Sequence, residues 1–154
     1  MSGSATKASG ATAKCAAGTL RRATRSISRV YDARLAPAGL TATQFSLLSA
    51  VQRRRGPVRL TELADELVFE RTSLYRNLTP LAREGLITLS NAGGRARQVA
   101  LSAKGVRRIA QALPLWTAAQ EDFLERFGRG PWNELAEQLV EIVDIARAMP
   151  GADG

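Results

Sequence analysis

The chain has 154 residues, of which 45% are hydrophobic and 23% charged; its net charge is +8, and it contains one cysteine and no histidine. This is the size and composition of one ordinary domain with a core of its own. Without histidine, and without any paired-carboxylate motif, we expect no enzyme, no metal and no cofactor. No apolar run approaches the roughly 18 residues of a membrane span, and no signal-peptide pattern begins the chain, so we expect a cytoplasmic protein without a membrane partner.

Positive charge is concentrated in the first two thirds of the chain. Residues 1–52 carry seven Lys or Arg and one acid, residues 53–108 carry twelve and five, and residues 109–154 carry three and eight. A basic region of this kind suits nucleic-acid phosphates. A GC-rich genome, which favours Arg, is the alternative explanation, but it does not predict the acidic tail.

The N-terminal elements are a polar tail and one helix. Residues 1–13 are Ser, Gly, Ala, Thr and Lys after the initial Met, which predicts disorder. An apolar stripe predicts a helix over residues 14–36, ended by Pro37 and Gly39. The stripe consists of Leu20, Ile27, Val30, Tyr31 and Leu35.

A second helix begins with a complete start signal. Thr41 and Gln44 have the spacing of a capping box, and Leu40 and Phe45 that of a hydrophobic staple. The helix is predicted to stop at the Arg-Arg-Arg-Gly-Pro of residues 53–57.

The central third contains two short helices followed by two short strands. Helices are predicted over residues 61–67 and 71–84, with a turn at 68–70 and a C-cap at Gly85. Residues 87–90 and 98–101 alternate in polarity around an Asn-Ala-Gly-Gly turn, as in a β-hairpin. This order is the layout of a winged helix-turn-helix, whose second helix reads the DNA major groove.

Two long helices are predicted to complete the chain. Ser102 is placed to cap a helix that breaks or bends near Pro114, and Gly128, Gly130 and Pro131 predict a turn. The last helix repeats apolar residues at intervals of four and three, which fits packing along another helix. These residues are Leu135, Leu139, Ile142, Ala146 and Met149. The apolar stripes exceed what one small domain covers, so we expect a homodimer.

Several patches, taken in order, resemble the MarR family of bacterial winged-helix repressors over about residues 15–145. They are 20–25 (Leu-Arg-Arg-Ala-Thr-Arg), 30–32 (Val-Tyr-Asp), 37–48 around Gly-Leu-Thr-Ala-Thr-Gln-Phe, 63–67, 71–78, 83–87 (Arg-Glu-Gly-Leu-Ile) and 99–105. The family's wing often carries Asp-x-Arg; here Arg95 is present, but Gly93 stands at the Asp position. The resemblance implies a repressor that binds a pseudo-palindromic operator and is released by a small molecule held between the dimer and reading domains.

This interpretation predicts a mainly α fold with a small β-wing. Residues 1–13 form the tail and 14–150 a single winged-helix regulator domain, in which 41–101 bind DNA and 14–38 and 103–150 form the dimer. The candidate DNA-binding residues are Arg71, Thr72, Ser73, Tyr75, Arg76 and Asn77 of the fourth helix, Arg95 and Arg97 of the wing, and Arg54 of the loop. Polar side chains near a helix start read base edges, and Arg binds guanine or phosphate. The alternative for each is an ordinary solvated face, and for Arg76 an ion pair with Glu70 or Asp65.

The trigger for release has three candidate forms. Tyr31, Trp116 and Phe123, with Arg25 nearby, are candidates to bind an aromatic or phenolic ligand, although aromatic residues at helical spacing also suit a core. A helix N-terminus and a neighbouring cation favour a thiolate, so Cys15 beside Lys14 is a candidate redox site. The third possibility is that there is no trigger, and the protein binds DNA without an effector.

Overall fold

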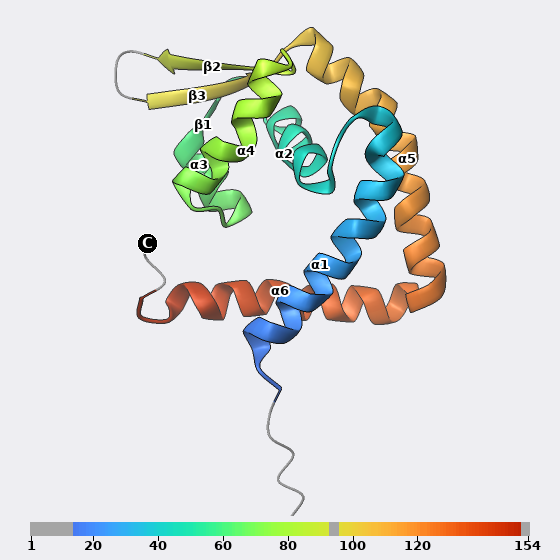
Figure 1. Ribbon diagram of the computed structural model, residues 1–154. Coiled ribbons are helices and arrows are strands. Elements are labelled where there is room, and N and C mark those ends of the chain that lie inside the picture. Colours follow the sequence, from blue (N-terminus) through green and yellow to red (C-terminus); the bar gives the residue numbers. More distant parts are fainter. Residues whose placement is uncertain (1–13, 93–95, 152–154) are drawn as a thin grey trace, which may run out of the picture.

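The computed structural model of the protein describes residues 14–92 and 96–151 (Figure 1). The predicted tail, residues 1–13, lies outside the described residues, as does Arg95. The elements are α1 (Ala16–Leu35), a 3₁₀ turn η1 (Ala36–Ala38), α2 (Ala42–Arg53), β1 (Val58–Arg59), α3 (Leu60–Leu67), α4 (Arg71–Arg83), β2 (Ile87–Ala92), β3 (Ala96–Leu101), α5 (Ala103–Phe127) and α6 (Arg129–Ala148). Helices α2–α4 and the strands gather in one lobe, α1 and α5 pack together at its side, and α6 turns back beneath it (Figure 1).

The start of α2 is fixed by side chains on both sides of its first turn. The predicted capping box is confirmed: the Gln44 N–H donates to Thr41 Oγ1 at 3.2 Å, and the Thr41 N–H donates to Gln44 Oε1 at 3.0 Å. In addition, Asp32 Oδ1 of α1 accepts the N–H of Ala42 at 2.7 Å. Because α1 supplies one of the acceptors for the free N–H groups of α2, the two helices are held at a fixed angle.

The predicted helix pair α3 and α4 is confirmed. The chain turns between them at Val68, whose φ of 56° is left-handed. In α4 the side chains of Leu74, Leu78 and Leu81 are at most 1% exposed, as their spacing of four and three predicts. Gly85, with φ of 73°, follows the C-cap residue rather than occupying it, the usual place of a left-handed glycine after a helix.

The wing is a three-stranded antiparallel sheet in the order β1-β3-β2. The two predicted strands pair with each other, Leu89 opposite Val99. The third strand, β1, was not predicted, and it places Val58 on the other side of Val99. Val58 and Val99 are both buried, so β1 ties the loop after α2 to the root of the wing.

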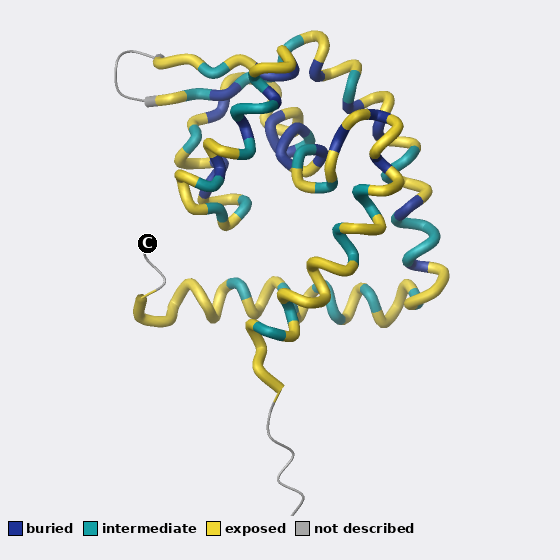
Figure 2. The backbone as a smooth tube through the Cα atoms, in the orientation of Figure 1, coloured by how far each residue is buried: buried dark blue, intermediate teal, exposed yellow. Residues whose placement is uncertain are grey.

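The core lies in the lobe made of α2–α4 and the root of the wing, and it extends to the corner where α1 meets α5 (Figure 2). Leu40 and Phe45, the predicted staple, are both buried in it. Leu35 of α1 and Ile109 of α5 belong to the same cluster. The lobe and the adjoining ends of α1 and α5 therefore form one packed unit.

The C-terminal helices are both present, but there is no break near Pro114, and the predicted turn at residues 128–131 is shorter. α5 continues through Pro114 without a break, and only Gly128 separates α5 from α6, because Pro131 lies in the first turn of α6. Proline is tolerated in a first turn, where its missing N–H has no helical partner. At Pro114 the lost bond would have gone to Ala110, and both residues are exposed, so water can bind the carbonyl of Ala110.

The first turn of α5 touches the backbone that leads into the wing. As predicted, Ser102 caps the helix: its Oγ accepts the Gly105 N–H at 3.0 Å and donates to the Gly85 carbonyl at 2.6 Å. A Cβ atom at position 105 would lie 2.1 Å from the Leu86 carbonyl oxygen. Only glycine fits there, so the start of α5 lies directly against the chain between α4 and β2.

α6 buries none of its residues in the described chain (Figure 2). Ile145 is 55% and Met149 61% exposed. The guanidinium of Arg147 donates to the Asp65 carbonyl near the end of α3, which lies above the C-terminal end of α6 in Figure 1. Across the described residues, none of the helices combines the length and apolar character needed to span a bilayer.

Candidate nucleic-acid interface

α4 presents a polar, exposed face opposite its buried leucines. Arg71, Thr72, Tyr75 and Arg76 are exposed, and Ser73 is half-buried. Glu70, the N-cap residue, makes no side-chain bond to the first-turn N–H groups. Those N–H groups therefore remain available to an anion at the positive end of the helix dipole.

The predicted reading residues differ in how far their polar groups are already bonded. Asn77 Nδ2 donates to the Ser73 carbonyl of its own helix at 2.8 Å, so one of its two N–H donors is used. Arg76 forms no salt bridge with any described residue, and neither Glu70 nor Asp65 is its partner. The alternative of an internal ion pair for Arg76 is therefore not realised in the described part of the chain.

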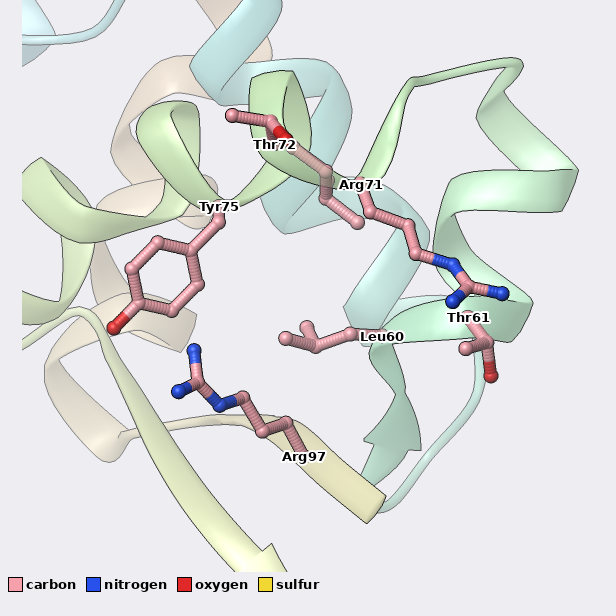
Figure 3. Close-up of a pocket in the computed structure, with 7 residues that line it drawn as sticks. Leu60, Thr61, Arg71, Thr72, Tyr75 and Arg97 are labelled. Carbon is pink, nitrogen blue, oxygen red and sulfur yellow. The ribbon is translucent and has the colours of Figure 1, made fainter. Parts of the chain in front are cut away.

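A cavity of about 460 Å³ lies between α3, α4 and β3. Its lining residues are Leu60, Thr61, Arg71, Thr72, Leu74, Tyr75 and Arg97; we call it the α4–wing groove. Figure 3 shows Leu60 between the guanidinium groups of Arg71 and Arg97. Two cations and three hydroxyl groups thus surround an apolar floor, an arrangement that suits a phosphate and its sugar.

Arg97 lies near the tip of the wing, opposite Asn91 of β2, and faces α4. Side chains alternate along a strand, so Arg97 shares the face of the buried Val99. Its guanidinium carbon lies 4.9 Å from the centre of the Tyr75 ring, within the range of a cation–π contact (Figure 3). The structure therefore joins two predicted DNA-binding residues that are far apart in sequence.

Arg54 is held in an ion pair across the α2–α3 connection. Its Nη2 and Nε donate to Glu66 Oε2 at 2.6 and 3.2 Å, and Arg53 Nη2 donates to Glu66 Oε1 at 3.1 Å. The hydrogen bond from Arg54, then that from Arg53, lowers the pKa of Glu66, and the same bond raises the pKa of Arg54. A phosphate at Arg54 would have to replace the carboxylate, so its role in DNA binding stays a prediction.

The predicted ligand residues do not form one site in the single chain. Trp116 stacks on Phe45 at 5.9 Å and lines a cavity of about 170 Å³ with Ala42, Ser46, Ser49 and Arg53. Phe123 instead packs against Phe127 and Trp132 where α5 meets α6. Tyr31 donates a hydrogen bond to Gln120, and burial raises its pKa. Arg25 is exposed on α1.

Cys15 is exposed and caps α1. Its Sγ accepts the Gly18 N–H at 3.5 Å. The predicted place of this thiol at a helix N-terminus is therefore confirmed, and its redox role stays a prediction.

Several lining residues were missed from the sequence, among them the following four. Leu60 and Thr61 belong to the α4–wing groove, and Ser46 and Ser49 to the cavity beside Trp116. A polar residue at the start of the first reading helix is a usual phosphate contact, and this signal marks Thr61. Nothing local marks the other three, because they meet their cavities only through the fold.

Comparisons with known proteins agree with this geometry. The family described as winged helix DNA-binding domain matches residues 40–105. The transcriptional regulator MosR of Mycobacterium tuberculosis, solved in complex with DNA, is 34% identical, with a TM-score of 0.79 over 88% of this chain and 98% of MosR. No curated protein sequence gives a significant match.

Two more distant structures share the fold alone. A MarR-family regulator from Rhodococcus sp. RHA1 is 18% identical, with a TM-score of 0.72 over 84% of this chain and 95% of its own. The organohalide-sensing regulator RdhR, in its 2,4-dichlorophenol-bound form, is 19% identical, with a TM-score of 0.76 over 89% of this chain and 83% of its own.

A reading helix, a three-stranded wing and a basic groove between them define a winged-helix, DNA-binding transcription regulator rather than an enzyme. The chain belongs to the MarR family of these regulators.

Proposed function

We propose that this protein is a homodimeric, sequence-specific repressor whose two α4 helices read the halves of a pseudo-palindromic operator. The α4–wing groove carries this proposal, since it places Arg71 and Arg97 on either side of an exposed helix start. In helix-turn-helix dimers, half-sites lie about one helical turn apart. Residues 41–101 are the DNA-binding part of this arrangement, and 14–38 with 103–150 the dimerisation part.

Each candidate residue has a proposed role. The exposed Thr72 and Arg76 and the half-buried Ser73 contact base edges, because they lie in the first turns of α4. Arg71 and Arg97 bind backbone phosphates on the two sides of the groove. Arg95, at the tip of the wing by sequence, contacts phosphate or the minor groove.

Charge and exposed apolar surface support a second copy of this chain as the partner. α6 leaves an apolar stripe uncovered, which a monomer of this size rarely does. α1 is basic and α6 is acidic, so the helices of two copies are complementary in charge. The exposed charged residues are Arg21, Arg22, Arg25 and Arg29 on α1, and Glu134, Glu137, Glu141 and Asp144 on α6.

Replacing Arg76 by Ala tests the reading role of α4. We expect a loss of about 1–3 kcal/mol on the operator and a relaxed preference at one base pair per half-site, because a base contact is lost. Arg83→Ala is the matched control, an exposed arginine at the other end of α4. The operator is first selected from a pool of random sequences. The affinities of wild type and both variants are then compared on the operator and on random DNA. Equal losses on both DNAs would make Arg76 a phosphate contact.

For the effector, we propose an aromatic or phenolic molecule bound beside Trp116. Arg53 lines that cavity, and it would exchange its bond to Glu66 for one to a carboxylate or phenolate of the ligand. Its volume of about 170 Å³ is below the roughly 300 Å³ of a typical ligand site, so the proposal requires walls from the second subunit. The proposal is supported by RdhR, which has the same fold and was solved in its 2,4-dichlorophenol-bound form.

We expect 2,4-dichlorophenol or benzoate, at saturating concentration, to weaken operator binding by about 5- to 150-fold, the usual range of coupling between two sites. Trp116→Leu should abolish that response, whereas Trp132→Leu, in the aromatic cluster between α5 and α6, should keep it. Fluorescence anisotropy of labelled operator measures the affinity of wild type and both variants with and without the ligand.

The alternative trigger is oxidation of the exposed, helix-capping Cys15. Under the ligand proposal, Cys15→Ser leaves release unchanged. If no aromatic acid or phenol shifts binding while Cys15→Ser abolishes release by peroxide, the redox alternative replaces it. If neither ligand nor oxidant shifts binding, the protein works without an effector.

A further inference from the structure

Arg97 has an aromatic partner where an ion pair would be expected. None of the salt bridges among the described residues includes Arg97, whereas Arg53 and Arg54, at the end of α2, are both paired with Glu66. The face of Tyr75 takes that place, 4.9 Å from the guanidinium carbon. Tyr75 itself is 41% exposed, so core packing does not explain its position.

The surroundings restrict where the Arg97 guanidinium can go. Its side chain leaves the strand on the buried face, beside Val99, and runs along the apolar floor of the α4–wing groove made by Leu60 and Leu74. The ring then covers one side of the charged group (Figure 3). A free arginine loses considerable rotamer entropy when it binds, and a contact that restricts its rotamers beforehand lowers this cost.

We infer that Tyr75 is a positioning residue: its ring holds the Arg97 guanidinium at the wing side of the groove, where Arg97 binds a backbone phosphate of the operator. The inference rests on the proposed DNA contact of Arg97 and deepens it. Both arginines line a cavity whose described lining contains no carboxylate, so its charge favours an anion. Tyr75 therefore acts through Arg97, not through a base.

A double-mutant cycle tests the inference, with Tyr75→Phe, Tyr75→Leu, Arg97→Gln and the Tyr75→Leu/Arg97→Gln pair. Tyr75→Phe keeps the ring and should bind the operator within about twofold of wild type. Tyr75→Leu should weaken binding by about 2- to 5-fold per subunit, the size of an exposed cation–π contact. In the Arg97→Gln background, Tyr75→Leu should cost nothing more, because the residue it positions is gone.

The salt dependence supplies a second readout that a purely structural role would not change. Arg97→Gln should lower the slope of log K against log salt by about 1 per subunit. Thermal unfolding checks that each variant is folded, and Tyr75→Gln serves as the second ring-free variant if Tyr75→Leu is not.

Three outcomes overturn parts of this argument separately. If Arg97→Gln changes neither affinity nor slope, the proposed contact of Arg97 with DNA fails. If Arg97→Gln weakens binding but the loss from Tyr75→Leu is the same in both backgrounds, Tyr75 contacts DNA itself or supports α4, and the positioning role fails. If Tyr75→Phe loses as much as Tyr75→Leu, the hydroxyl and not the ring is the functional group.

Discussion

Operator affinity should fall by about 10³- to 10⁵-fold when salt rises from about 50 to 200 mM, with a slope of log K against log salt of about −5 to −9. This slope corresponds to roughly six to ten phosphate contacts in a dimer, or three to five per subunit. Arg71 and Arg97 line the α4–wing groove, and the uncapped first turn of α4 adds its own N–H groups. Anisotropy titrations at several salt concentrations measure the slope.

Two variants show whether the slope comes from the groove. Arg71→Gln should reduce its magnitude by about 1 per subunit, and Arg83→Gln should leave it unchanged, because Arg83 lies at the far end of α4. A slope near zero for the wild-type protein would contradict phosphate binding by this face. A slope reduced equally by both substitutions would show that net charge, not the groove, sets the affinity.

Ile142→Glu should separate the dimer and weaken operator binding by about 10²- to 10⁴-fold. Ile142 lies on the uncovered stripe of α6 with Ile145 and Met149, and a buried carboxylate there has no partner. A monomer contacts one half-site, so the gain from binding two linked half-sites is lost. Sedimentation at micromolar concentration should give about twice 16.5 kDa for wild type and 16.5 kDa for the variant.

Val140→Glu is the matched control. Val140 is 64% exposed on the same helix, but it lies two residues from Ile142 and so points to nearly the opposite side. It should leave both mass and affinity unchanged. A wild-type protein that sediments as a folded monomer, or an Ile142→Glu variant that remains a dimer, would contradict an interface along this stripe.

The reading lobe was predictable because its signals are local. The spacing of Leu74, Leu78 and Leu81 and the capping box of Thr41 and Gln44 each involve residues within one or two helical turns, and all are realised. β1 was missed because a two-residue strand has no periodicity to detect. It exists only because Val99, some forty residues later, supplies its partner.

The candidate site was predictable in its residue types but not in its pairings. The sequence marks Tyr75, Arg97 and Arg54 as exposed and polar, but not that Arg97 meets an aromatic ring while Arg54 meets Glu66. Those contacts depend on how strands and helices approach each other in space. Trp116 and Phe123 share α5, and their spacing along it suggested a common pocket. In the single chain, however, Trp116 packs against Phe45 of α2 and Phe123 against Trp132 of α6, so this pocket does not form.

The glycine at position 105 has a consequence for motion in this molecule. Glycine usually gives a chain freedom, but here its missing side chain allows α5 to lie against the Leu86 carbonyl, so that close packing and the Ser102 hydrogen bonds fasten the first turn of α5 to the chain that leads into the wing. Under the proposed dimer, a change in the separation of the two α4 helices is then expected to originate farther along α5. Pro114, which lacks the N–H of a helical hydrogen bond, is the place on α5 where we expect the helix to change its angle.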